Sequence, residues 1–320
     1  MARVLAGTIA GAVAVMAAAA ACAQNFPSKP VQILTTQAGG GSDFVSRVVA
    51  QAIAGPLGQP VVIDNRGGSV TVAGDLLAKA PPDGHVLLLY ASAIWLAPFL
   101  QDHVAYDPVR DFAPVTLVAS SPYVMVVPPS LPVKTARDFI ALAHARPGQL
   151  NYASLGNGSA GHLTGALFAT MAGIKLTHVP YKLVGSVLTD LMSGQLQLFF
   201  LGAVSAHAQI KGGRLHAIGV TGIRRSALLP DVPTVAEAGV PGYEVTGWYG
   251  VFVPAGTPAV IVNKLNREIA RILKLPDVRE RLSAEGAELI ANSPAEFAAY
   301  IKSEIVKWAR VVKIAGARED

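Results

Sequence analysis

The segment YASLGNGSAGHL, Tyr152–Leu163, indicates the fold class of this chain, because a glycine-rich turn in it joins a strand-like run to a helix-like run. Gly156, Gly158 and Gly161 match G-x-G-x-x-G, the spacing with which dinucleotide-binding turns cradle phosphates. Alternating apolar strands and amphipathic helices are typical of α/β proteins. The segment therefore predicts an α/β fold and leaves open which anion the turn holds.

A dinucleotide is not the expected ligand of this turn. The fingerprint requires an acidic residue roughly 20 positions further on, where it binds the ribose. The next strand instead carries Lys175 and His178, and the first acid is Asp190. The backbone N–H groups and positive dipole end of a helix bind carboxylates as well as phosphates. We therefore expect no cofactor and predict a carboxylate, with Asn157 and Ser159 adding polar side chains.

A similar turn occurs earlier in the chain, where Thr36–Asp43 reads TQAGGGSD between another strand and another amphipathic helix. Asp43 is interpreted most simply as a helix-start acid that the dipole stabilises; alternatively it holds an ordered water or a ligand amine. Two ordinary serine-capped turns would also explain the pattern. Their matched positions favour a ligand with one or two carboxylates, held from both sides. The candidate residues of this turn are Gly39, Gly40, Gly41, Ser42 and Asp43.

Two proline clusters predict that the chain crosses twice between two lobes. The first cluster surrounds a strand at residues 123–127, and the second lies within residues 230–241. We predict that residues 24–123 and 231–320 form lobe 1 and that residues 124–230 form lobe 2. Each lobe is expected to be a mixed, mostly parallel sheet flanked by helices.

The N-terminal residues predict export. Arg3 precedes the uncharged apolar run Val4–Ala21, and Ala21–Ala23 supplies a small-residue cleavage site. We predict a signal peptide over residues 1–23 and a periplasmic mature protein. A retained anchor and lipidation at Cys22 are the alternatives. Because Cys22 is the only cysteine, the mature chain would have no disulfide.

Composition and spacing argue against several other functions. The net charge is +5, but the basic residues are scattered, so we expect no nucleic-acid binding. The histidines lack metal-ligand spacing, so no metal site is expected. Ser159 lies three residues before His162 without a nearby carboxylate, which makes an exported serine hydrolase only an alternative. We expect a binding protein with no catalytic residues.

Several motifs in combination resemble the periplasmic solute receptors of tripartite tricarboxylate transporters, the Bug proteins. The resemblance runs from about Phe26 to Gly316. The motifs are GGGSD from Gly39, APPDGHVLL from Ala80, YDPVRDFAPVTLV from Tyr106, LNYASLGNGSAGHL from Leu150, HVPYK from His178, LTDLMSGQ from Leu188, RRSALLPDVPTVAEAGVPGYEV from Arg224 and VPAGTP from Val253.

The resemblance implies a two-lobed flytrap that closes on a small organic acid and delivers it to a membrane permease. A sensor that presents the closed form to a membrane kinase is an alternative. We expect a monomer. In this family, backbone groups and ordered waters hold the carboxylates, and small polar residues line the cleft. Carried over, the ligand-binding positions are Gly39 to Asp43 in one lobe, Asn157, Gly158 and Ser159 in the other, and Ser92.

The chain departs from the family pattern at the predicted cleft edge. Leu201 and Gly202 stand where members commonly have an acid followed by Asn, and Ala38 replaces a proline. Losing an acid and an amide removes partners for an ammonium or hydroxyl group. Leu201, together with Ile94 and Trp95, would suit an apolar or aromatic body. We therefore predict a carboxylate with an apolar part, rather than citrate or an amino acid.

Overall fold

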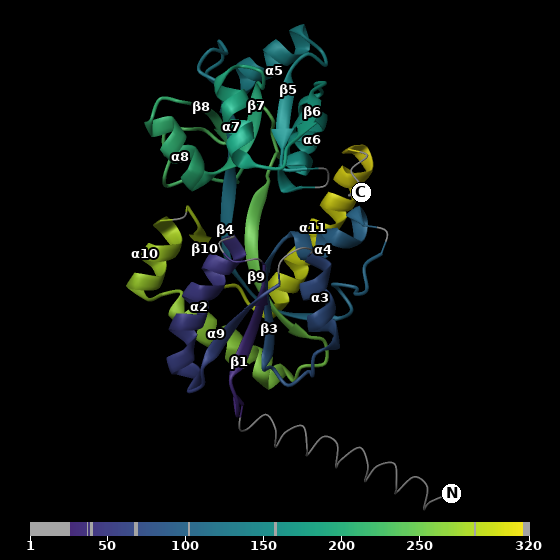
Figure 1. The fold of residues 1–320 in the computed structure, drawn as a ribbon, viewed down its shortest axis with the longest axis vertical. Coiled ribbons are helices and arrows are strands. Elements are labelled where there is room, and N and C mark those ends of the chain that lie inside the picture. The colour runs from purple at the N-terminus through teal and green to yellow at the C-terminus, as the bar shows by residue number, and fades with distance from the viewer. Residues whose placement is uncertain are drawn as a thin grey trace, which may run out of the picture.

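Two lobes stacked along the long axis make up the molecule (Figure 1). The computed structural model describes residues 26–315 apart from positions 37, 39, 40, 67–69, 102, 157, 158 and 285. The lobes are joined by the long antiparallel strands β4, Phe112–Val127, and β9, Thr246–Pro254. The predicted signal peptide with Cys22 lies outside the described residues, as do Gly39, Gly40, Asn157 and Gly158.

Lobe 1 is a mixed sheet between two helical layers. Strand β1 pairs in parallel with β2 and β3, whereas β9 runs antiparallel between β3 and β4. Its other strands are β1 Val31–Thr35, β2 Val61–Asn65, β3 Val86–Ala91 and β10 Glu288–Leu289. One face carries α2 Gly41–Leu57, α9 Ala259–Ile272 and α10 Pro276–Ala284. The other carries α3 Val70–Lys79, α4 Ala93–Leu100 and α11 Pro294–Ala315.

Lobe 2 repeats this arrangement around the far end of β4. Strand β5 pairs in parallel with β6 and β7, and β4 pairs antiparallel with β7 and β8. The strands are β5 Asn151–Ser154, β6 Thr177–Pro180, β7 Leu198–Gly202 and β8 His216–Val220. One face carries α5 Ala136–Ala145 and α6 Ala160–Ala172, and the other carries α7 Val184–Met192 and α8 Ala203–Lys211. The predicted two-lobed α/β fold is thus confirmed, with antiparallel strands at the junction.

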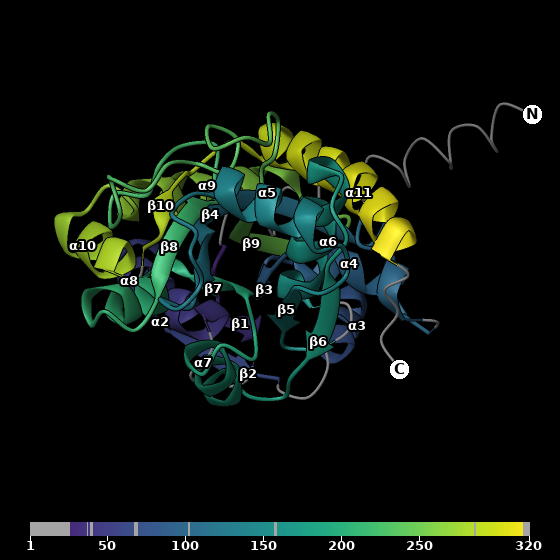
Figure 2. The ribbon, with the colours of Figure 1, turned by 90° about the horizontal axis from the view of Figure 1, so that it is seen from above.

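The strand β4 changes partners at the junction between the lobes. Pro122 is its last residue paired with β9, and Tyr123 is its first paired with β7. After β8 the chain stays with lobe 2, because Val235 N donates to Val220 O at 2.9 Å and Tyr243 Oη donates to Thr164 O at 3.0 Å. These contacts favour a return to lobe 1 at the start of β9 rather than at residue 231. In Figure 2, α11 runs along one side of the molecule toward α6, which it contacts.

Candidate functional site in the interlobe cleft

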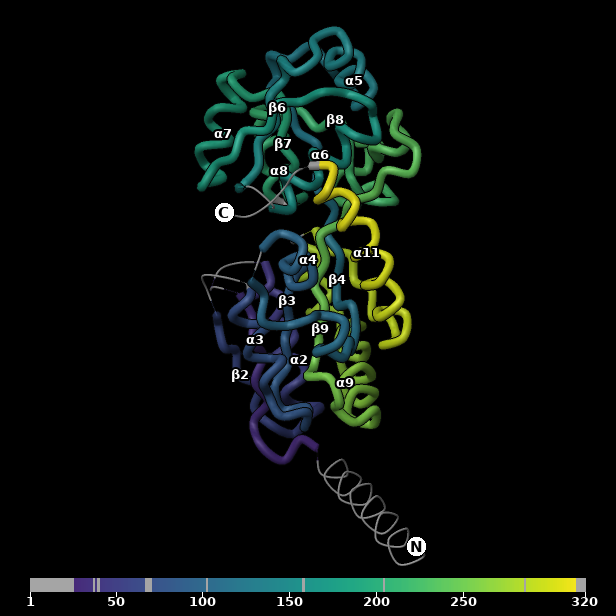
Figure 3. The backbone as a smooth tube through the Cα atoms, turned by 90° about the vertical axis from the view of Figure 1, so that its right-hand side faces the viewer, coloured from purple at the N-terminus to yellow at the C-terminus, as the bar shows by residue number. Residues whose placement is uncertain are grey.

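A cavity of about 170 Å³ lies where the two lobes meet the strands that join them. Figure 3 shows α6 of lobe 2 above α4 of lobe 1, with β4 and β9 beside them. The cavity takes its walls from the end of β3, from α4, from the two joining strands and from the start of α6. Its lining residues are Ala91, Ser92, Ala93, Leu96, Ala97, Leu100, Tyr123, Ser159, Ala160, Gly247, Trp248 and Tyr249.

The lobe 2 wall is the N-terminus of α6. Ser159 caps this helix, since its Oγ accepts a hydrogen bond from His162 N at 3.3 Å. The same hydroxyl donates to Gly156 O at 2.8 Å. Ser159 and Ala160, at the start of α6, both line the cavity. The first backbone N–H groups of a helix have no partner within the helix. Such a terminus attracts an anion.

The lobe 1 wall is mainly apolar. Ser92 lies at the turn between β3 and α4, next to Ala91 and Ala93. Beyond it, one face of α4 presents Leu96, Ala97 and Leu100. A cavity with an anion-attracting end and an aliphatic wall suits a compact acid that carries an apolar portion.

Two tyrosines of the joining strands also line the cavity, and the sequence did not identify them. Burial, with a smaller contribution from Tyr249, raises the pKa of Tyr123 to about 12. Its phenol is therefore neutral at physiological pH and can donate a hydrogen bond. The pairing of β4 with β9 brings these residues together, and no local sequence pattern specifies that pairing.

The first glycine turn reaches the cavity through Tyr249. A Cβ on Gly41, the first residue of α2, would overlap the Tyr249 hydroxyl and lie 3.2 Å from its ring carbon Cζ. Gly41 therefore permits the start of α2 to approach a wall of the cleft. Ser42 is buried beside it, and Ser42 O accepts a hydrogen bond from Ser46 Oγ at 2.7 Å.

Asp43 is buried and engaged within lobe 1. It accepts hydrogen bonds from Arg47 Nε at 3.0 Å and from Asn65 Nδ2 at 2.8 Å, and it forms an ion pair with Arg47. Asn65 also donates to Thr36 O at 2.7 Å, which ties β2 to the start of the glycine turn. These contacts favour the interpretation of Asp43 as a helix-start acid that orders the turn.

Leu201 is not among the residues that line the cavity. Only 5% of it is exposed, and it packs in the lobe 2 core with residues of α7 and α8. Gly202 is exposed and precedes α8. Ile94 and Trp95 are fully buried in the lobe 1 core. The predicted apolar residues Leu201, Ile94 and Trp95 thus do not line this cavity, whereas Leu96, Ala97 and Leu100 of α4 do.

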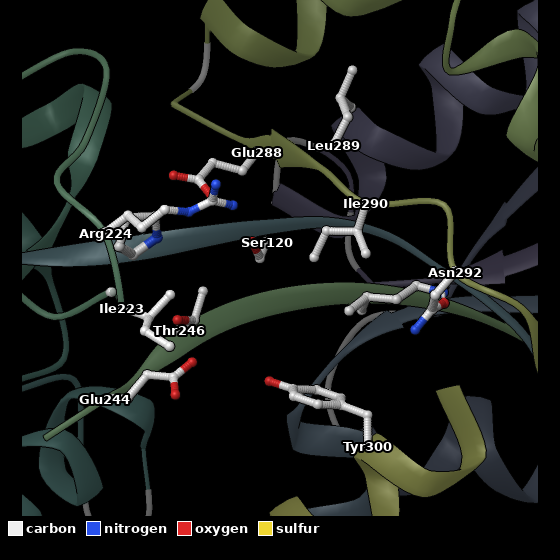
Figure 4. Close-up of a pocket in the computed structure, with 13 residues that line it drawn as sticks. Ser120, Ile223, Arg224, Glu244, Thr246, Glu288, Leu289, Ile290, Asn292 and Tyr300 are labelled. Carbon is white, nitrogen blue, oxygen red and sulfur yellow. Dashed lines mark hydrogen bonds and ion pairs between the residues drawn. The ribbon is translucent and has the colours of Figure 1, made fainter. Parts of the chain in front are cut away.

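A larger cavity, of about 460 Å³, lies on the other side of the joining strands (Figure 4). Pro122 and Thr246 line it, whereas their strand neighbours Tyr123 and Gly247 line the first cavity. Arg224 of lobe 2 and Glu288 of lobe 1 approach to 3.9 Å across it. Among the described lining residues none begins a helix, and the carboxylates Glu244 and Glu288 outnumber the cation Arg224, so this cavity is the weaker candidate for a carboxylate site.

The described part of the chain shows neither a cluster of metal-ligating side chains nor a membrane-spanning helix. Among those residues, no three His, Cys, Asp or Glu side chains gather as metal ligands would. Likewise, none of the helices described there is long and apolar enough to cross a bilayer.

Comparison with known proteins agrees with this geometry. The profile of the tripartite tricarboxylate transporter family receptor (TctC) matches residues 45–317. The chain belongs to this receptor family. The receptor is 38% identical over 313 residues to the "UPF0065 protein in tcbD-tcbE intergenic region" of Pseudomonas sp. (strain P51), covering 97% of this chain and 93% of that one. BugT of Bordetella pertussis is 35% identical over 305 residues, covering 94% of each chain.

Solved structures extend the comparison. R. palustris Rpa4515 with adipate has a TM-score of 0.77 and 35% identity, over 92% of this chain and 99% of that chain. MatC of Rhodopseudomonas palustris with bound malate has a TM-score of 0.74 and 34% identity, over 90% of this chain and all of that one. The resemblance to Bug receptors drawn from the sequence is thereby confirmed.

Proposed function

We propose that this receptor captures a small organic carboxylate between its lobes in the periplasm and delivers it to a membrane permease. The observation that carries the proposal is the cavity in which the start of α6 from lobe 2 faces Ser92 and α4 of lobe 1. A ligand there contacts both lobes at once, so its binding favours the closed arrangement. Two bodies would move against each other. Lobe 1 would comprise residues 24–123 and 246–320, and lobe 2 would comprise residues 124–245.

The ligand we propose has a carboxylate at the α6 end and an aliphatic portion along α4. Rpa4515 and MatC, whose structures hold adipate and malate, support a dicarboxylate of similar size. The volume of about 170 Å³ is compatible with a compact acid and smaller than the ~300 Å³ at which pockets for drug-sized ligands begin. Gly41, Ser92 and Ser159 are the described positions of the predicted site that reach it directly or through Tyr249.

The contacts of Ser159 do not support a hydrolase. Its hydroxyl hydrogen bonds Gly156 O, and it meets His162 through that residue's backbone N–H rather than its imidazole. The His162 ring stacks on His178 instead. No described contact therefore activates Ser159 as a nucleophile, and capture without chemistry is the function the site favours.

A thermal-shift screen tests this function. The mature protein is heated with adipate, malate, citrate, aspartate, benzoate and, as a control, ATP. A ligand at ~100 times its Kd raises the unfolding free energy by about 2.7 kcal/mol. We expect adipate or another acid with an aliphatic portion to raise the Tm most. No shift with any carboxylate, in protein shown by mass spectrometry to be free of copurified ligand, would refute the proposal.

A further inference from the structure

A cluster of serine and histidine side chains lies behind the glycine turn of lobe 2, and of its members Ser159 also lines the cavity. Ser154 ends β5 before the turn, and Ser159 begins α6 after it. Ser154 is fully buried, and its Oγ lies 2.6 Å from His178 Nε2 on β6. Both serines bond the same peptide group, Gly156 O, at 2.8 Å. Gly156 has φ +115°, a conformation that favours glycine.

The hydrogen bonds define the protonation of His178. Ser154 has one hydroxyl hydrogen; with that hydrogen donated to Gly156 O, the matching tautomer of His178 is the one that donates from Nε2–H to Ser154 Oγ. Gly156 N also donates to Ser154 Oγ, at 3.2 Å. His178 thus orients Ser154, and Ser154 in turn binds the peptide group of Gly156 at the start of the turn.

The helix side of the turn connects to the same histidine. His162, whose N–H bonds the capping Ser159, stacks on His178 with ring centroids 3.9 Å apart and planes 8° apart. The other titratable ring against His178 is Tyr152 of β5, at 5.0 Å. Two stacked imidazoles therefore connect the strand end and the helix end of the turn.

We propose that His178 and His162 are positioning residues for the anion-binding turn of lobe 2, His178 by donating to Ser154 and His162 by stacking on His178, and that a bound carboxylate requires the turn in this arrangement. The carboxylate part of this statement rests on the proposed function; the positioning part does not. The chemistry requires neutral rings, because two cations at this spacing repel. Consistent with this, burial and the neighbouring His162 lower the pKa of His178 to about 4, and burial lowers that of His162.

Hydrogen exchange of the segment 155–163 in the ligand-free protein tests the positioning role. His178→Phe keeps a ring beside His162 but cannot donate to Ser154, whereas His178→Gln keeps a donor but loses the ring. His144→Gln, on the exposed side of α5, is the matched control. Rates are compared between proteins at equal pH, which cancels the intrinsic pH dependence of exchange.

At about pH 7 we expect His178→Phe to speed exchange of this segment about fivefold, the effect of one net hydrogen bond, with a smaller increase for His178→Gln. A ratio near one for His178→Phe, or an increase at least as large for His178→Gln, would overturn the proposal; the second result would indicate that the ring fills space rather than holds Ser154.

Calorimetry with adipate separates this inference from the proposed function. We expect wild type and His144→Gln to bind adipate alike at about pH 7 and His178→Phe to bind it about fivefold more weakly. If the exchange results hold but the wild type binds no acid of the screen, the function fails and the positioning role stands. If the wild type binds and His178→Phe binds equally well, the link between the pair and the carboxylate fails.

Discussion

Gly41→Ala tests whether the start of α2 contributes to the cleft. The new Cβ would overlap the Tyr249 hydroxyl, while the next atom, Cζ, is 3.2 Å away. Overpacking of this kind costs about 1–3 kcal/mol, and replacing glycine in a helix returns at most ~1 kcal/mol. We therefore expect a net destabilisation of about 1 kcal/mol, together with weaker carboxylate binding because Tyr249 must move.

A double-mutant cycle with Tyr249→Phe measures the contact itself. Removing the hydroxyl leaves only the 3.2 Å approach, so most of the penalty should disappear in the double variant. We expect a coupling free energy of about 1–2 kcal/mol from urea denaturation of the four proteins. Additive effects, or a Gly41→Ala protein with wild-type stability and affinity, would refute the close approach of α2 to the cleft wall.

Gly165→Ala should lower the unfolding free energy by about 1–3 kcal/mol in urea, because its Cβ would overlap the buried Tyr152 ring; a neutral effect would contradict that packing. Since the pKa of His178 is about 4 when folded and near 6.5 when unfolded, the unfolded state binds more protons between these values. Tm should therefore fall as pH drops from 6.5 to 5, above the range in which carboxylates titrate, and fall less in His178→Gln; parallel curves would exclude this contribution. Arg224→Ala should change stability by less than about 1 kcal/mol, because its 3.9 Å pair with Glu288 is exposed; a larger loss on denaturation would show that the pair locks the lobes.

Local chemistry made the helix starts predictable from the sequence. Thr135 and Asp138 form a reciprocal capping box at α5, with bonds of 3.2 and 3.0 Å, and Ser293 pairs with Glu296 in the same way at α11. These signals lie within four residues of each other. The two glycine-rich turns likewise predicted where α2 and α6 begin.

The cleft walls were less predictable, because they depend on contacts distant in sequence. Helix α4 contains Pro98 and is almost uniformly apolar, so neither its period nor a polar cap indicated it. Tyr123 and Tyr249 meet only through the pairing of β4 with β9. Leu201 lies in a strand buried on both faces, where alternation cannot distinguish core from cleft.

Adding a negative charge at the start of α6 tests most directly whether the ligand's carboxylate binds there. Ala160 is exposed there and lines the cavity, so Ala160→Asp would place a carboxylate where the ligand's is proposed to bind. An acid in the first turn stabilises a helix by about 0.3–1 kcal/mol, so the fold should tolerate it. Ala160→Asn is the matched uncharged control.

The decisive measurement is calorimetric titration of wild type, Ala160→Asp and Ala160→Asn with adipate. We expect the wild type to bind adipate and Ala160→Asn to bind it with near-normal affinity. For Ala160→Asp we expect an affinity at least tenfold lower, with no loss of Tm. Equal binding by all three proteins would contradict this expectation, because the carboxylate would then lie somewhere other than the start of α6.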